Sequence, residues 1–160
     1  MSGRPAPNIA ALLAPVIAQL EGPEWPALLA RLEHIAGNRY RAWAQRAPAL
    51  ARELLACADR EDDISARGAK LFALSDVQRA RVDGLVPGVR EAYAGLFAGL
   101  TLREELALQA NAERQGAAAW RAISGQPVLP DPARAAIAEL ALLEEANATQ
   151  LERLLASWHD

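Results

Sequence analysis

The residues of this chain best suited to chemistry are four glutamates: Glu33, Glu61, Glu113 and Glu144. Each lies on, or at the edge of, the apolar stripe of a predicted helix. A buried carboxylate costs several kcal/mol or takes up a proton, so lone ones are rare in protein interiors. Two charges about 4 Å apart repel by roughly 4 kcal/mol at an effective dielectric constant near 20. Four glutamates on facing helices therefore predict a shared site that cations, protons or arginines must neutralise.

The composition predicts that helices carry these residues. Alanine, leucine, arginine and glutamate dominate, and no alternating apolar and polar run of strand length stands out. Thr101 and Glu104 form a capping-box pattern that starts one helix. Prolines and glycines divide the chain into segments, and we expect a short amphipathic helix at residues 8–21 and four long helices at 24–47, 48–74, 101–124 and 132–157.

The connections between these helices predict the topology. The first pair and the last pair of long helices are each joined closely, whereas the middle connection is long. It carries a short helix that starts at Ser75 and fades near Gly84, and another piece that starts at Pro87. Two hairpins joined by one long crossover form an all-α, up-down four-helix bundle. We expect a single domain over 1–160, with the N-terminal helix within 1–22 and the bundle at 23–158.

Helical geometry, at about 100° per residue, predicts which of the acidic side chains face the core. Glu61 and Glu113 fall near the middle of their apolar stripes, and Glu144 and Asn147 both lie within the stripe of the last helix. Glu33 sits at the edge of its apolar face. A weak internal repeat supports the pairing, because residues 33–42 match residues 113–122, so the second half of the chain looks like a copy of the first.

The order, spacing and orientation of these glutamates on the predicted helices resemble those of the ferritin-like superfamily over residues 24–158. The resemblance is to its rubrerythrin-type carboxylate bundles in particular. In that family, two helices each give one glutamate and the other two each give a Glu-x-x-His motif, which together hold a pair of iron or manganese ions. The resemblance implies that Glu33 and Glu113 match the single glutamates. It implies that Glu61 and Glu144 match the glutamates of the two Glu-x-x-His motifs.

The chain departs from the family at both histidine positions, which hold Ile64 and Asn147. Isoleucine cannot ligate a metal, and an asparagine carbonyl oxygen is a weak ligand suited to hard cations. We expect His34 to point to solvent, and His159 is the penultimate residue. A di-iron centre of the family's usual kind is therefore not predicted.

Three interpretations follow. The first is a ferritin-like, non-catalytic protein without a bound cofactor, acting in interaction or small-ligand binding, whose carboxylates form a polar core neutralised by Arg39 or Arg114. The second is a divalent-metal oxidoreductase or metal-binding protein, with iron or manganese held by Glu33, Glu61, Glu113, Glu144 and either Asn147 or water. The third is a structural helical domain whose glutamates face water. We expect Asn147 to form hydrogen bonds in the core more readily than it ligates a metal.

Other features narrow the function classes. The net charge of −3 and the lack of a basic stripe disfavour nucleic-acid binding. No stretch has the length and apolarity of a membrane span, and a single cysteine, Cys57, excludes an intrachain disulfide and predicts a buried, inert thiol. We expect a soluble cytoplasmic protein. The apolar side chains of the N-terminal helix, among them Ile9, Leu13 and Val16, motivate the prediction of a homodimer.

Overall fold

The structure is a computed structural model that describes residues 7–127 and 129–158, and these residues form helices and the turns between them. The all-α prediction is therefore confirmed for this part of the chain. The helices are α1 (Ile9–Ile17), α2 (Glu24–Arg46), α3 (Ala51–Gly68), α4 (Asp76–Phe97), α5 (Leu102–Ser124) and α6 (Asp131–Ala156), with a 3₁₀ turn at Pro48–Leu50 before α3.

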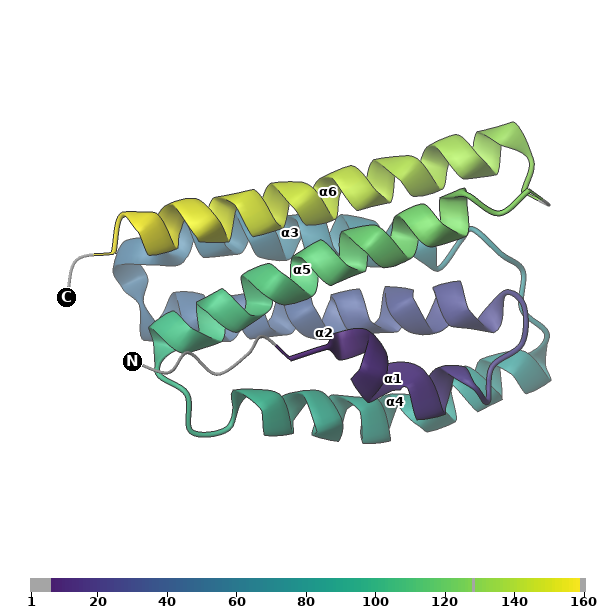
Figure 1. Ribbon diagram of the computed structural model, residues 1–160, viewed down its shortest axis with the longest axis horizontal. Coiled ribbons are helices and arrows are strands. Elements are labelled where there is room, and N and C mark those ends of the chain that lie inside the picture. The colour runs from purple at the N-terminus through teal and green to yellow at the C-terminus, as the bar shows by residue number, and fades with distance from the viewer. Residues whose placement is uncertain (1–6, 128, 159–160) are drawn as a thin grey trace.

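Two helix hairpins make up most of the molecule. Helix α2 packs along α3, α5 packs along α6, and α3 contacts α6 so that the hairpins lie together (Figure 1). Helix α4 runs along the outside of α2, and the short α1 lies against α4 and α5. None of the helices in the described ranges is long and apolar enough to cross a membrane.

Three apolar cores hold the helices together. Core A contains Tyr40, Trp43, Leu54, Leu106 and Leu151, core B contains Leu29, Ile64, Trp120, Ile137 and Leu140, and core C contains Ile9, Leu13, Leu32 and Val89. Each of the four long helices passes from core A to core B, and its candidate glutamate lies between the two, as Glu33 does between Leu29 and Tyr40. The fold therefore places a layer of carboxyl groups between two apolar layers.

Core C joins α1 to the rest of the molecule. Ile9 and Leu13 of α1 are buried against Leu32 of α2 and Val89 of α4. The apolar face of α1 thus has a partner within its own chain. The homodimer stays a prediction.

Three predicted segments differ from the helices of the structure. The helix predicted at 48–74 starts with a 3₁₀ turn and ends at Gly68, where a Cβ atom would lie only 3.0 Å from the Trp120 ring. The N-terminal helix ends at Ile17 and not at residue 21. The two predicted pieces of the crossover are one helix, α4, which continues through Pro87. Proline removes one helical hydrogen bond, the one to the carbonyl of Asp83 four residues earlier, and both residues are exposed, so solvent can supply the replacement.

The capping box at the start of α5 is confirmed. The Thr101 hydroxyl accepts a hydrogen bond from the Glu104 backbone N–H, and the Glu104 carboxylate accepts one from the Thr101 backbone N–H at 2.8 Å. These two bonds satisfy donors that the helix itself leaves unpaired.

Replacing Thr101 by alanine should lower the free energy of unfolding by about 1 kcal/mol, because the first turn of α5 loses its side-chain acceptor. Urea unfolding followed by circular dichroism measures the loss. Thr101→Ser is the matched control, because it keeps the hydroxyl and should lose far less. Equal losses in the two variants would contradict the assignment.

Candidate functional site: a buried carboxylate cluster

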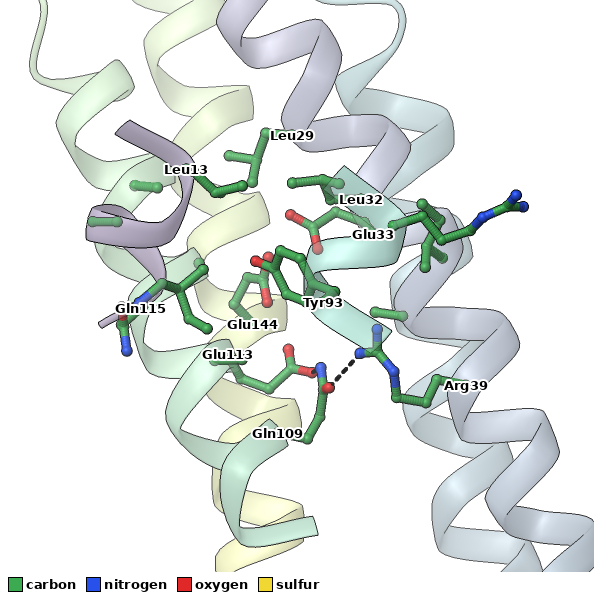
Figure 2. Close-up of a pocket in the computed structure, with 18 of the residues that line it drawn as sticks. Leu13, Leu29, Leu32, Glu33, Arg39, Tyr93, Gln109, Glu113, Gln115 and Glu144 are labelled. Atoms are coloured by element: carbon green, nitrogen blue, oxygen red, sulfur yellow. Dashed lines mark hydrogen bonds between the residues drawn. The ribbon is translucent and has the colours of Figure 1, made fainter. Parts of the chain in front are cut away.

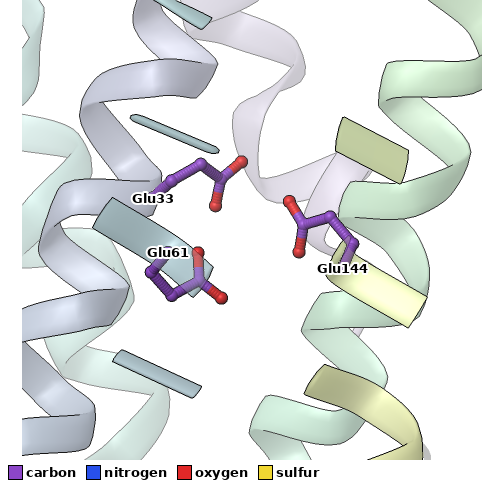
Figure 3. A group of neighbouring side chains, drawn as sticks. All are labelled: Glu33, Glu61 and Glu144. Carbon is purple, nitrogen blue, oxygen red and sulfur yellow. The ribbon is translucent and has the colours of Figure 1, made fainter. Parts of the chain in front are cut away.

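Three glutamates from three helices converge in the layer between cores A and B. Glu33 of α2, Glu61 of α3 and Glu144 of α6 each offer one oxygen, and these oxygens all lie within 4.8 Å of one another. Figure 3 shows the three carboxyl groups turned towards a common point. All three side chains are buried, including Glu33, which we had expected only at the edge of its apolar face. The third interpretation, glutamates that face water, is therefore wrong for this cluster.

Glu113 of α5 is the fourth member of the site. It is 2% exposed, and its Oε1 accepts hydrogen bonds from the Tyr40 hydroxyl at 2.7 Å and from Gln109 Nε2 at 2.6 Å. Its negative charge contributes to raising the pKa of each of the other three glutamates. The converging oxygens belong to Glu33, Glu61 and Glu144, and Glu113 acts on them through its charge from beside that group.

Neutral donors outside the cluster hold one oxygen on each of three glutamates. Besides the bonds to Glu113, Asn147 Nδ2 donates to Glu61 Oε1 at 2.5 Å, and Trp120 Nε1 donates to Glu144 Oε1 at 3.2 Å. Such donors orient a carboxylate without neutralising its charge. They leave the second oxygen of each group available to whatever lies at the centre.

Within the cluster, two buried carboxylate oxygens have no hydrogen-bond partner among the described residues: Glu33 Oε1 and Glu61 Oε2. An unpaired buried acceptor costs about 1–3 kcal/mol, and more where the group is charged. Buried polar atoms in native proteins are nearly always paired, so each exception calls for an explanation. A bound cation, or a proton carried by one carboxyl group and shared with another, would satisfy these two atoms.

The arginines near the site differ from the sequence prediction. Arg114, one of the two arginines proposed as partners of the cluster, lies on the surface and pairs with Glu152 at 2.7 Å, which leaves Arg39 as the inner candidate of the two. Arg39 does lean inwards. It donates to Gln109 Oε1 at 2.7 Å, its guanidinium lies 4.2 Å from the centre of the Phe97 ring, and it reaches Glu113 only through Gln109.

Sequence analysis missed the role of Arg60. Its Nε donates a hydrogen bond to the Asn147 amide oxygen at 2.5 Å. Asn147 therefore receives a hydrogen bond from Arg60 and passes one to Glu61. Held in this way, Asn147 supports the position of the Glu61 carboxylate. The signal in the sequence was the position of Arg60, one residue before Glu61 and so turned towards the neighbouring helix.

Burial changes the protonation of the cluster. It raises the pKa of Glu33 to about 8, with the negative charge of Glu113 as the second cause. Burial is also the main cause that raises the pKa of Glu61 well above its usual value, and the negative charges of Glu113 and Glu33 add to this effect. Burial raises the pKa of Glu144 in the same way, and the charge of Glu33 is the second cause. Without a cation, Glu33 therefore keeps its proton at neutral pH, and the raised pKa values of Glu61 and Glu144 favour their protonated forms. A cation that binds there must displace these protons.

A cavity of about 100 Å³ opens onto the cluster from the side covered by α1 and α4 (Figure 2). Glu33, Glu113 and Glu144 line it together with apolar residues of α1 and α2, and Tyr93 of α4 lies across it. The cluster is thus buried but has an adjoining space large enough for a small molecule.

Two other sequence predictions concern residues close to the site. Cys57 is buried and free, and burial raises the pKa of its thiol to about 11, so it is protonated and a poor nucleophile at neutral pH. His34 is exposed as predicted and 3.8 Å from Asp62, so it does not join the cluster. His159 lies outside the described residues.

Gly116 keeps space for the Glu144 carboxylate. A Cβ atom at this position would lie 2.9 Å from Glu144 Oε1 and 3.0 Å from its carboxyl carbon. Gly116→Ala should therefore push the carboxylate of Glu144 out of the cluster without removing it. We expect the affinity for Mn²⁺ to fall by about 10-fold or more, the effect typical of disturbing the groups that orient a ligand.

Gly95→Ala is the matched control for this variant, since a Cβ atom there would meet nothing within 4 Å. It should leave Mn²⁺ binding unchanged and stabilise α4 by about 0.5–1 kcal/mol. Isothermal titration calorimetry measures the affinities. An unchanged affinity in Gly116→Ala would show that the position of Glu144 does not matter to binding.

Comparison of the chain with protein families, curated proteins and solved structures found no match. The site is therefore interpreted from its own residues.

Proposed function

We propose that this protein is a ferritin-like helical bundle that binds a divalent cation, manganese or ferrous iron, in a site made of carboxylates. The observation that carries the proposal is the convergence of Glu33, Glu61 and Glu144 oxygens within 4.8 Å of one another, with two of their buried oxygens unpartnered. A cation at the centre would satisfy both oxygens and neutralise the charges that burial otherwise disfavours.

The donor set fits such a cation. Glu33, Glu61 and Glu144 would hold it directly, and the charge of Glu113 beside them would add to their attraction for the cation. Carboxylate and water ligands suit hard cations such as Mn²⁺, whereas the histidines that favour iron chemistry in the resembling family are replaced here by Ile64 and Asn147. A bound cation of this kind supplies Lewis acidity. We propose binding and not catalysis as the role, because the protein residues that would complete an oxygen-activating centre are missing.

The residues of this chain have defined tasks in the proposal. Tyr40 and Gln109 orient Glu113, Trp120 orients Glu144, and Asn147 orients Glu61. Cores A and B exclude water on both sides of the carboxylate layer, which strengthens its attraction for a cation. The proton that Glu33 holds at neutral pH leaves when the cation enters.

The second candidate is the binding of a small organic ligand. The observation that favours it is the cavity on the α1 side of the cluster, which a metal site alone does not require. In that interpretation the carboxyl groups meet a polar group of the ligand.

Manganese binding tests the proposal. Protein stripped with EDTA and dialysed should take up at least about one equivalent of Mn²⁺ per chain, measured by elemental analysis after gel filtration, and its thermal midpoint should rise in proportion to the logarithm of free Mn²⁺. Mg²⁺ at the same concentration is the control for general ionic effects and should give a smaller rise. The absence of both uptake and a change in the midpoint at millimolar Mn²⁺ would overturn the proposal.

A further inference from the structure

The cavity beside the cluster combines an apolar wall with an acidic floor. Leu13 of α1 and Leu29 and Leu32 of α2 line the wall. Glu33 and Glu144 lie at its inner side, with their carboxyl groups facing the cavity in Figure 2. A site for a metal ion alone needs the acidic floor but has no use for the wall. The pairing fits a molecule with a charged head and an apolar body.

The acidic floor of the cavity determines which chemical group of a ligand can bind there. Once a cation has displaced their protons, these carboxyl groups are ionised and only accept hydrogen bonds, so a cationic group that binds there must donate them. Glu33 Oε1 is buried, lacks a partner among the described residues, and belongs to a residue that lines the cavity. A group that carries positive charge as well as N–H donors would both pair this atom and offset the charge of the cluster.

The arginines at the cavity do not already meet this need. Arg39 lines it, but its guanidinium is held by Gln109 and by the ring of Phe97. Arg90 also lines it and is exposed to solvent, where water screens its charge. Among the residues that line the cavity, one inward-leaning guanidinium therefore stands against three carboxyl groups.

The size of the cavity limits the body of the ligand. Its volume is about 100 Å³. An apolar protein cavity of roughly 150 Å³ holds a benzene molecule. A straight or branched alkyl group of about four carbons is therefore the largest body that fits without movement of α1 or α4.

We infer that the cavity binds a small primary ammonium compound with a short alkyl tail. The ammonium group lies at Glu33 and Glu144, and the tail lies against Leu13, Leu29 and Leu32. The site uses the same carboxylates as the proposed cation site, so the two ligands exclude one another. The inference rests on the carboxylate cluster and not on a metal being bound.

A ligand series on the complete, EDTA-treated chain tests the inference by calorimetry at constant ionic strength. The probes are n-butylammonium, n-butanol with the same tail but no charge, butyrate with the opposite charge, and methylammonium with the head alone. We expect n-butylammonium to bind one per chain, at least about tenfold more tightly than any of the others, because only it uses both the floor and the wall. Added Mn²⁺ should weaken its apparent affinity by competition.

Two variants separate the wall from the floor. Ala112 of α5 also lines the cavity, and Ala112→Phe should fill it, abolish binding of n-butylammonium and leave Mn²⁺ binding in place. Glu33→Gln removes the unpartnered acceptor and should weaken both ligands. If Ala112→Phe also loses Mn²⁺, the ligand series on the unmodified chain still decides the inference.

The outcomes distinguish this inference from the proposed cation site. Equal affinities for n-butylammonium and n-butanol would overturn the ammonium assignment. Mn²⁺ binding without n-butylammonium binding would overturn the inference and leave the cation site standing. Failure of both ligands would overturn the inference and the proposed function together.

Discussion

The metal-free protein should become less stable as the pH rises from 5 to 8, the reverse of ordinary acid denaturation. Glu33 has a pKa of about 8 in the folded protein, raised by burial, against 4.5 as the ordinary value. Between these two values the folded state keeps a proton that the unfolded state has released. The free energy of unfolding then falls by about 1.4 kcal/mol per pH unit for each such carboxyl group.

The sign follows from the raised pKa. The contribution of Glu33 is fully present below pH 4.5 and is lost as the pH rises through 8. Glu61 and Glu144 have their pKa raised by burial as well, so they steepen the fall. Groups with a lowered pKa, such as Glu104 at the Thr101 cap, act in the opposite direction but only below pH 4.5.

Urea unfolding in EDTA at pH 5, 6, 7 and 8 measures this dependence. Saturating Mn²⁺ is the internal control, because a bound cation replaces the protons and should restore stability most at the high end of the range. A free energy of unfolding that stays level or rises between pH 5 and 8 in EDTA would show that these carboxyl groups do not keep their protons in the folded protein.

The second large effect concerns Glu61→Gln. We expect this variant to bind Mn²⁺ at least about 100-fold more weakly than the unmodified protein. Losing a group that only orients a metal ligand typically lowers the metal affinity by about 10–100-fold, and losing the ligand itself should cost no less. The metal-free variant should nevertheless be more stable than the unmodified protein at pH 8. Glutamine has the same shape, its carbonyl oxygen still accepts from Asn147 Nδ2, and it carries no charge to bury.

Asp63→Asn is the matched control, since Asp63 lies on the same helix two residues later, with about half of its side chain exposed, beside Arg67. It makes the same change of charge on the surface and should alter Mn²⁺ affinity by less than about twofold. Calorimetry at pH 7 gives the affinities, and urea unfolding at pH 8 gives the stabilities. Equal affinities in the two variants would place the cation outside the cluster.

The sequence was sufficient to predict the elements that carry the site. Apolar periodicity gave the four long helices and placed Glu61, Glu113 and Glu144 on their inner faces, because the period of a helix fixes where Cβ points. Boundaries were less predictable. Pro87 suggested a break in the crossover, but α4 continues through it at the surface of the molecule.

The long side chains around the site were the hardest to predict. Arg60 and Arg114 both lie near the edge of an apolar face, yet Arg60 turns inwards to Asn147 and Arg114 turns outwards to Glu152. Several rotatable bonds separate each guanidinium from its backbone, so helical phase does not determine where it ends. The cavity could not be predicted at all, because it depends on how α1 and α4 pack against α2 and α5.

Anomalous X-ray scattering from crystals grown with Mn²⁺ tests the central claim most directly. Data collected on both sides of the manganese absorption edge locate the ion without assuming its ligands. We predict a peak in the interior, between the carboxyl groups of Glu33, Glu61 and Glu144. Peaks confined to surface carboxylates, with none inside the helices at saturating Mn²⁺, would contradict the account.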